Sequence, residues 1–337
     1  MIAGALMLGT IAAQAEVKVV ANEAQKRVDV TIDGKPFTAY VWPDSLMKPV
    51  LDPLVAPDGT VVTRGYPLFP KAGERVDHPH HAGLWFNYGN VDNFDYWNNS
   101  TAIPEANRPK YGTIHHTKIV SAKSGANSGE LVVDSIWTNG LGKDVMSERT
   151  RYVFSKMKEG RSIDVLVTLH ALDKVTFHDD KEGMLGIRVA SFLESANEKG
   201  GIFTDANGKQ TKVDGAGSPG ASGVYLTSEG VQGEKVWSTR GKWCSLTGTT
   251  DGKTEVIAIL DNPKNPNYPT YWHARGYGLF AANPLGQHIF DPKAPQLDYS
   301  VPTGGDVKFQ YRVELLSHAT NAAEMNKDQA AFAAEYK

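Results

Sequence analysis

The chain has 337 residues, of which 41% are hydrophobic and 22% are charged, and these fractions are typical of a folded globular protein rather than a disordered one. Its formal net charge of −3 provides no basic field for nucleic acid, so nucleic acid is not an expected partner. The single cysteine, Cys244, excludes an internal disulfide and a metal site built from several cysteines.

The first fifteen residues, MIAGALMLGTIAAQA, are predicted to be a signal peptide. They carry no charge and end in Ala13-Gln14-Ala15, the small-x-small pattern that signal peptidase cleaves. The alternative is an apolar first strand. A membrane span is not expected, because it needs about 20 apolar residues and no run in the sequence approaches that length. We therefore expect a bacterial protein exported to the periplasm or secreted, with residues 16–337 as a single domain and no membrane span.

Short segments of alternating apolar and polar residues, separated by Gly, Pro and Asn, dominate the rest of the chain and predict strands. The clearest predicted strands are residues 27–32, 37–42, 113–122, 130–138, 148–156, 161–172, 185–194, 236–246, 254–261, 278–282 and 307–316. Residues 321–336 have apolar positions at helical spacing and predict a short C-terminal helix. This pattern indicates an all-β fold in which two large antiparallel sheets form a sandwich.

The most informative stretch is DHPHHAGLWF at residues 77–86, which holds three of the ten histidines. In an extended segment His78 and His80 would point the same way, and imidazoles serve as general acids and bases near neutral pH. The stretch predicts His80 or His81 as a catalytic group, with Asp77 orienting a histidine. No cofactor is predicted, although a divalent metal held by His78 and His80 is an alternative.

The residues that follow, from Trp85 to Asn99, are rich in aromatic and amide side chains. Sugar rings stack their CH faces on aromatic rings and pair their hydroxyls with amides and charged groups. Trp85, Asn87 and Trp97 are therefore predicted to bind substrate. The alternative is an Asn-rich loop whose aromatic rings pack in the core.

A second stretch, DNPKNPNYPTYWHARGY at residues 261–277, has a similar composition, and we expect the fold to bring the two together. His273 and Arg275 share a face if the chain is extended. His273 would exchange protons with the substrate, and Arg275 would stabilise developing negative charge. The alternative is a packed loop in which Arg275 pairs with a core carboxylate.

Four other residues are predicted to contact substrate: His170, Arg188, Asn283 and Glu314. His170 lies on the polar face of its predicted strand, which either lines the site or faces solvent. Arg188 lies in an apolar strand, where a charge is costly unless it is paired, and Glu314 is a candidate partner.

Three motifs carry a resemblance to a known family: DHPHHAGLWF, DNPKNPNYPTYWHARGYGLFAANPLG and FQYRVELL. With them the chain resembles, over residues 17–318, a bacterial family of unknown function whose members carry the label "methane oxygenase PmoA". Many members have Arg where this chain has Ala82. The chain lacks the spanning segment that a membrane oxygenase subunit would need.

The expected fold resembles the galactose-mutarotase β-supersandwich. Proteins of that type place two histidines and a glutamate around a sugar ring. The resemblance offers His80 or His81 for the first histidine, His273 or His170 for the second, and Glu314 for the glutamate.

The sequence as a whole favours an exported carbohydrate-active enzyme that uses histidine acid/base chemistry on a small-molecule or oligosaccharide substrate. Hydrolase, lyase and epimerase activities all remain open. A non-catalytic carbohydrate-binding protein is the first alternative, and a His-ligated metalloprotein is the second.

Overall fold

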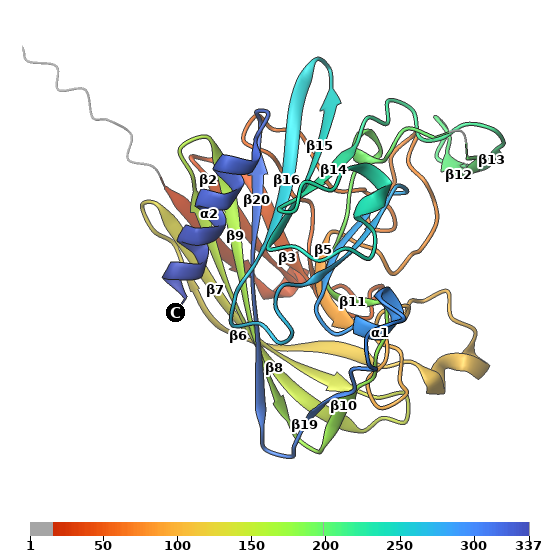
Figure 1. The fold of residues 1–337 in the computed structure, drawn as a ribbon, viewed down its shortest axis with the longest axis vertical. Coiled ribbons are helices and arrows are strands. Elements are labelled where there is room, and N and C mark those ends of the chain that lie inside the picture. The colour runs from red at the N-terminus through yellow and green to blue at the C-terminus, as the bar shows by residue number, and fades with distance from the viewer. Residues whose placement is uncertain (1–15, 198, 337) are drawn as a thin grey trace, which may run out of the picture.

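The computed structural model describes residues 16–197 and 199–336, and its main feature is a pair of large antiparallel sheets (Figure 1). Sheet 1 has eight strands in the order β1 (Val17–Asn22), β2 (Arg27–Ile32), β3 (Lys35–Val41), β4 (Val50–Leu51), β5 (Leu84–Tyr88), β11 (Gly183–Arg188), β18 (Leu279–Asn283) and β17 (Tyr271–Arg275). Sheet 2 also has eight, in the order β14 (Val224–Thr227), β15 (Trp243–Thr250), β16 (Lys253–Asp261), β20 (Asp306–Leu316), β9 (Gly160–Ala171), β8 (Asp144–Lys156), β7 (Ser128–Thr138) and β6 (Thr113–Lys123).

The remaining elements are short. Two pairs of strands form small ladders, β10 (Val175–Phe177) with β19 (Tyr299–Val301) and β12 (Gly201–Thr204) with β13 (Gln210–Val213). The helices are α1 (Gln287–Phe290) and α2 (Ala322–Glu335), with 3-10 turns η1 (Glu23–Gln25), η2 (Glu105–Lys110), η3 (Ser191–Leu193) and η4 (Gly233–Val236). No helix among the described residues is long and apolar enough to cross a membrane.

The main core lies between the two sheets, because alternate residues of each strand face inward. In β9 the inward residues Ile163, Val165 and Val167 are buried in the main apolar cluster, while Thr168 and His170 lie on the outer face. This period-two pattern is what made the strand recognisable in the sequence.

Helix α2 covers the outer face of sheet 2 (Figure 1). Its Met325 and Phe332 pack on Ala258 and Leu260 of β16, and the Asn321 side chain caps its first turn. Glu314 lies on this covered face, opposite Ala258 in the β16–β20 register. It is 0% exposed, and neither of its carboxylate oxygens has a hydrogen-bond partner among the described residues.

The outer face of sheet 1 carries a third apolar cluster that includes Trp85, Trp97 and Ala281. The two indoles lie over Gly186 of β11, where an added Cβ would be 2.6 Å from Trp85 Cζ2. Only glycine leaves room for the rings at that point. The ladder register places Trp85, Gly186, Ala281 and His273 in one row across four strands.

The all-β prediction, with two large antiparallel sheets and a short C-terminal helix, is confirmed. Most predicted strands are present, but residues 236–242 are not a strand, and β11 ends at Arg188 rather than at residue 194. The exposed hairpin β12–β13 lies within residues 199–233, which are rich in glycine. The predicted signal peptide, residues 1–15, lies outside the described residues.

Glu314 makes the stability of the protein depend on pH. Burial, and then the charge of Asp328, raise the pKa of Glu314 from 4.5 to about 8. The folded protein therefore holds this proton more tightly than the unfolded chain does, and the resulting stabilisation, complete below pH 4.5, is lost as pH rises to 8.

The substitution Glu314→Gln keeps the site neutral. Relative to wild type, it is expected to increase the free energy of unfolding at pH 8 by on the order of 3 kcal/mol and to have no such effect at pH 4.5. Urea unfolding at both pH values measures this difference. Glu159→Gln, at a side chain 64% exposed, is the matched control. An equal effect of Glu314→Gln at both pH values would contradict the prediction.

Candidate functional site

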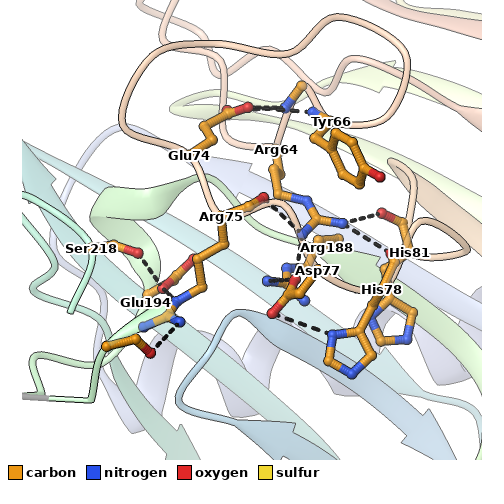
Figure 2. A network of polar contacts seen from close by, with 12 residues as sticks. Arg64, Tyr66, Glu74, Arg75, Asp77, His78, His81, Arg188, Glu194 and Ser218 are labelled. Atoms are coloured by element: carbon orange, nitrogen blue, oxygen red, sulfur yellow. Dashed lines mark hydrogen bonds and ion pairs between the residues drawn. The ribbon is translucent and has the colours of Figure 1, made fainter. Parts of the chain in front are cut away.

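Asp77 is held between two buried arginines above the outer face of sheet 1 (Figure 2). Its Oδ1 accepts a hydrogen bond from Arg64 Nη1 at 2.6 Å and another from Arg188 Nη2 at 2.7 Å. The Arg64 and Arg188 side chains are 1% and 0% exposed, whereas that of Asp77 is 32% exposed. Arg188 was predicted to pair with Glu314, and this is wrong, because Glu314 lies on the outer face of the other sheet.

The two arginines determine the charge of Asp77. Burial acts to raise the pKa of Asp77, but His78 and the charges of Arg188 and Arg64 outweigh it and hold that pKa well below its usual value. Burial, followed by the charge of Arg188, lowers the pKa of Arg64 to about 9. Asp77 is thus an ionised carboxylate across the neutral range.

Arg64 also holds the chain around the histidines. Its guanidinium donates to the backbone carbonyls of Arg75, His78 and His81 at distances of 3.0–3.2 Å. These bonds clamp the segment from both ends (Figure 2).

The clamped segment is a turn, so it is not the extended segment in which His78 and His80 would point the same way. The amide of His81 donates to the carbonyl of His78 at 2.9 Å, with Pro79 at the second position of the turn. His78 has a φ of 44°, a left-handed conformation that costs a non-glycine residue about 1 kcal/mol. Such strain persists only where the surrounding contacts impose it, and here Arg64 and Asp77 do so.

The turn arranges four rings in a stack. Tyr277 lies parallel to His78 with centroids 5.0 Å apart, His78 to His81 at 4.9 Å, and His81 to Trp85 at 5.2 Å. Because Tyr277 ends the second motif and His78 belongs to the first, the two motifs meet as expected.

The stack closes His81 to substrate. His81 is 2% exposed, and its Nε2 accepts a hydrogen bond from Trp97 Nε1 at 3.1 Å. Burial, and then the neighbouring His80, lower the pKa of His81 well below its usual value. His81 is therefore a neutral packing group, and the structure does not support its predicted role in proton exchange.

His273 is also enclosed, at 2% exposed, and His80 is half-buried. Burial is the largest cause that lowers the pKa of His80 to about 2 and that of His273 to about 3. The nearest carboxylate oxygen to His273 Nδ1 is that of Glu182, at 3.7 Å. His273 lies on the same face of sheet 1 as Trp85, but three strand spacings, about 14 Å, separate them.

A cavity of about 460 Å³ opens beside Asp77. It is lined by Arg75, Asp77, Asn197, Lys199, Gly200, Glu234, Trp237, Ala274, Arg275, Gly276 and Tyr277. The guanidinium carbon of Arg275 lies 5.6 Å from the ring centre of Trp237 and 6.0 Å from that of Tyr277. Arg275 is exposed and makes no ion pair with any described residue, unlike Arg75, which pairs with Glu194.

His78 is not one of the lining residues, but it lies against two of them, Asp77 and Tyr277. Its side chain is 41% exposed, and its Nδ1 is 3.3 Å from Asp77 Oδ2. It is the accessible imidazole of the cluster, although sequence reasoning had considered it only as a metal ligand. The turn conformation makes His78 accessible, and no feature of the sequence was used to predict that conformation.

Several predicted substrate contacts are structural instead. Trp85 and Trp97 are 2% and 0% exposed, and they form the packed layer on sheet 1. The amides of Asn87 and Asn283 are fully buried and donate to the carbonyls of Tyr96 and Asp180.

Two further candidates lie away from the cavity, on the outer face of sheet 2. His170 contacts Asp306 at 2.8 Å there, and Glu314 lies beneath α2. Neither residue contributes to the site on sheet 1, so the placement that the mutarotase resemblance implied for them is wrong.

Sequence reasoning missed Arg64, Trp237 and Tyr277 as parts of the site. Trp237 had been assigned to a strand, and Tyr277 had been quoted in the second motif without a role. Arg64 lies in the Pro- and Gly-rich approach to the histidines and carries no recognisable pattern.

Within the described residues, no three His, Cys, Asp or Glu side chains converge as metal ligands. The rings of His78 and His80 are nearly perpendicular, with centroids 5.6 Å apart. In the described part of the chain this pair has no third such ligand beside it.

These features define an all-β, two-sheet protein with an aromatic-lined polar cavity on the outer face of one sheet. The chain belongs to DUF6807, a family of unknown function, whose model matches residues 27–330. The family description does not include the methane oxygenase label. A search of curated proteins finds no match.

Several solved structures with similar architecture have sugar-related or mutarotase-like names. The chain is similar to the GH36 alpha-galactosidase AgaB from Geobacillus stearothermophilus, with 11% identity, a TM-score of 0.40, and coverage of 90% of this chain and 42% of that one. Galactose 1-epimerase from Lactobacillus acidophilus NCFM has 9% identity and a TM-score of 0.38, with coverage of 90% of this chain and 98% of that one. A galactose mutarotase-like protein from Clostridium acetobutylicum has 10% identity and a TM-score of 0.40, with coverage of 90% of this chain and 98% of that one. At these scores no residue role is transferred, and the chain spans about two fifths of the alpha-galactosidase.

The role of Asp77 in holding the site can be tested through stability. Among the described residues, Asp77 is the only carboxylate within ion-pair distance of both Arg64 and Arg188, and Asp77→Asn is expected to lower the free energy of unfolding by about 2 kcal/mol or more. Urea unfolding measures the loss. Asp134→Asn, which removes the partner of Arg149 in a pair whose arginine is 61% exposed, is the control and should cost less than about 1 kcal/mol. Equal losses in the two variants would contradict the assigned role.

Proposed function

We propose that this protein is a carbohydrate-active enzyme that binds a sugar in the 460 Å³ cavity and uses His78, oriented by Asp77, to transfer a proton. The observation that carries the proposal is a cavity lined by an ionised carboxylate, an arginine and two aromatic rings, with the accessible imidazole of His78 in contact with two of these groups, Asp77 and Tyr277. Each of these groups has a separate task in such a reaction.

The aromatic groups suit a sugar ring. Trp237 and Tyr277 line the cavity, and the CH face of a pyranose stacks on such rings. Around them, Asn197, Glu234 and Arg275 provide the amide, carboxylate and guanidinium groups that pair with hydroxyls. A purely apolar ligand would leave these polar groups without partners.

The Asp77–His78 pair suits proton transfer. His78 Nδ1 lies 3.3 Å from Asp77 Oδ2 and has no hydrogen-bond partner among the described residues, so a proton carried at Nδ1 would face the ionised carboxylate and leave Nε2 to accept a proton from the substrate. Holding the imidazole in one tautomer and orientation is the usual task of a carboxylate in this position. Arg275, across the cavity, would stabilise negative charge that develops on a substrate oxygen.

The same geometry disfavours a two-carboxylate glycosidase. The carboxylates that line the cavity are Asp77 and Glu234, and a general acid in that mechanism needs a raised pKa. The pKa of Asp77 is lowered instead, because of His78 and two arginines. Elimination and epimerisation, which need proton removal from the sugar, fit a histidine base better.

We also propose that the enzyme works outside the cytoplasm, in the periplasm or secreted. This part rests on the predicted signal peptide of residues 1–15 and on nothing in the site.

The test is the substitution His78→Gln, assayed on neutral and acidic monosaccharides and oligosaccharides. We expect kcat to fall at least 100-fold while binding, measured by calorimetry, changes less than threefold, since a general base contributes about 10²–10⁴-fold to the rate. His170→Gln, on the outer face of sheet 2, is the matched control and should keep full activity. Activity that survives in His78→Gln would refute the proposed mechanism. Wild-type binding without turnover would favour the carbohydrate-binding alternative.

The binding half of the proposal has its own test. Trp237→Ala removes one wall of the cavity and is expected to weaken sugar binding about fivefold or more, because stacking on one aromatic ring contributes about 1 kcal/mol or more. Trp42→Ala, at a half-buried ring that lines a different cavity, should bind as wild type does. Equal affinity in all three proteins would place the sugar elsewhere.

A further inference from the structure

A second, smaller cavity of about 190 Å³ lies beside the other end of the histidine turn, against Pro79 and His80. Its polar lining comes from segments far apart in the sequence: Ser45, Lys48, His80, Asn99, Ser100 and Thr101. It shares no lining residue with the cavity beside Asp77. The proposed function does not use it.

Lys48 is the unusual member of this lining. It is 4% exposed, and its Nζ donates to the backbone carbonyl of His80 at 2.6 Å and lies 5.2 Å from the centre of the Trp85 ring. Among the described residues, no carboxylate lies within ion-pair distance of it. A buried ammonium with one carbonyl partner is costly, because burial is repaid only by a counter-charge or by further hydrogen bonds.

Three other largely buried cations have a counter-charge, whereas Arg161, which is 4% exposed, donates to two backbone carbonyls instead. Arg64 pairs with Asp77, Arg75 with Glu194, and Arg312 with Asp164. Lys48 instead lines a cavity and has no carboxylate partner among the described residues. Burial lowers the pKa of Lys48 to about 7, against a small opposing effect from the charge of Asp95.

A second buried polar atom at this cavity has no partner. The side chain of His80 lines the cavity, and its Nε2 makes no hydrogen bond with any described residue. Ser100, which is 7% exposed, and the more exposed Thr101 add hydroxyl groups that can donate. An unpaired ammonium, an imidazole and hydroxyls are the donors that a small oxyanion requires.

We propose that this cavity is a binding site for a small oxyanion, either a free ion or an acidic group carried by a sugar, with Lys48 as its counter-charge and His80 and Ser100 as further donors. The site stands on its own geometry and does not depend on the catalytic role of His78. A bound oxyanion would supply the missing partner of Lys48 and would make its protonated form the favoured one.

The test is calorimetric titration at constant ionic strength with two probes, inorganic sulfate and D-glucuronate, and with D-glucose as the neutral comparison. Wild type is expected to bind at least one of the two anions with one-to-one stoichiometry. Lys48→Met, which replaces the ammonium by an apolar chain of similar length, should weaken that binding at least tenfold. Lys158→Met, at a side chain 95% exposed, should leave it unchanged.

Wild type provides a second readout that needs no variant. At pH 8, binding should take up protons, seen as an enthalpy that depends on the ionisation heat of the buffer, because a mostly neutral Lys48 must become charged. The titratable groups nearest to Lys48 are His80 and Asp95. With a pKa of about 2, His80 stays neutral at pH 8, and Asp95 is a carboxylate whose pKa, although raised mainly by burial, starts from 3.8.

The outcomes separate the sources and the failures. Tighter binding of glucuronate than of sulfate assigns the site to an acidic sugar, and the reverse order assigns it to a free anion; both support the proposal. Binding that is equal in wild type and Lys48→Met, or that takes up no proton, means an adventitious ion only and overturns it. Absence of binding by both anions also overturns it. None of these binding results bears on the proposed function, which is tested separately by the loss of sugar turnover in His78→Gln.

Discussion

The ionic contact of Asp77 with Arg64 and Arg188 is the interaction on which the site depends. Arg188 projects from β11 of sheet 1, and Arg64 binds the carbonyls at both ends of the histidine turn. Two buried guanidinium groups without a carboxylate between them would be strongly unfavourable. The Asp77 carboxylate therefore anchors the histidine turn to the sheet. The turn then orients all three imidazoles of the cluster.

This anchoring divides the histidines by role. In the turn, His78 faces outward beside the larger cavity, while His81 faces inward between Trp85 and Trp97. His80 points to the smaller cavity with Lys48. A single four-residue turn thus borders the proposed proton-transfer site on one side, the proposed anion site on the other and a packing layer beneath. The strain at His78 is consistent with this arrangement, because a relaxed extended segment would expose His78 and His80 on the same side.

Much of the fold could be predicted because its signals are local. The alternation in β9 and β20 and the helical spacing of α2 each reflect one buried face, so composition and period were enough. β5 and β17 were harder, because both faces of these strands are buried and their residues do not alternate. Their aromatic and histidine residues were therefore read as loop motifs.

The site could be predicted only in part. The two motifs were correctly expected to meet, and Asp77 and Arg275 do line one cavity. Which histidine is accessible depends on a positive φ at His78 and on the indole of Trp97, a contact between residues 16 positions apart. Glu314 was misplaced for a similar reason, since nothing in its strand indicates that α2 covers the face on which it lies. Contacts of this kind depend on how the elements pack, which a single sequence does not specify.

The central claim is that the turn exposes His78 and closes His81 and His273. Brief treatment of the native protein with diethyl pyrocarbonate, followed by fragment mass spectrometry that resolves neighbouring histidines, tests this claim most directly. The account predicts that within the motif His78 is carbethoxylated first, and that His81 and His273 react only after unfolding. Modification of His81 or His273 before His78 in the folded protein would contradict it.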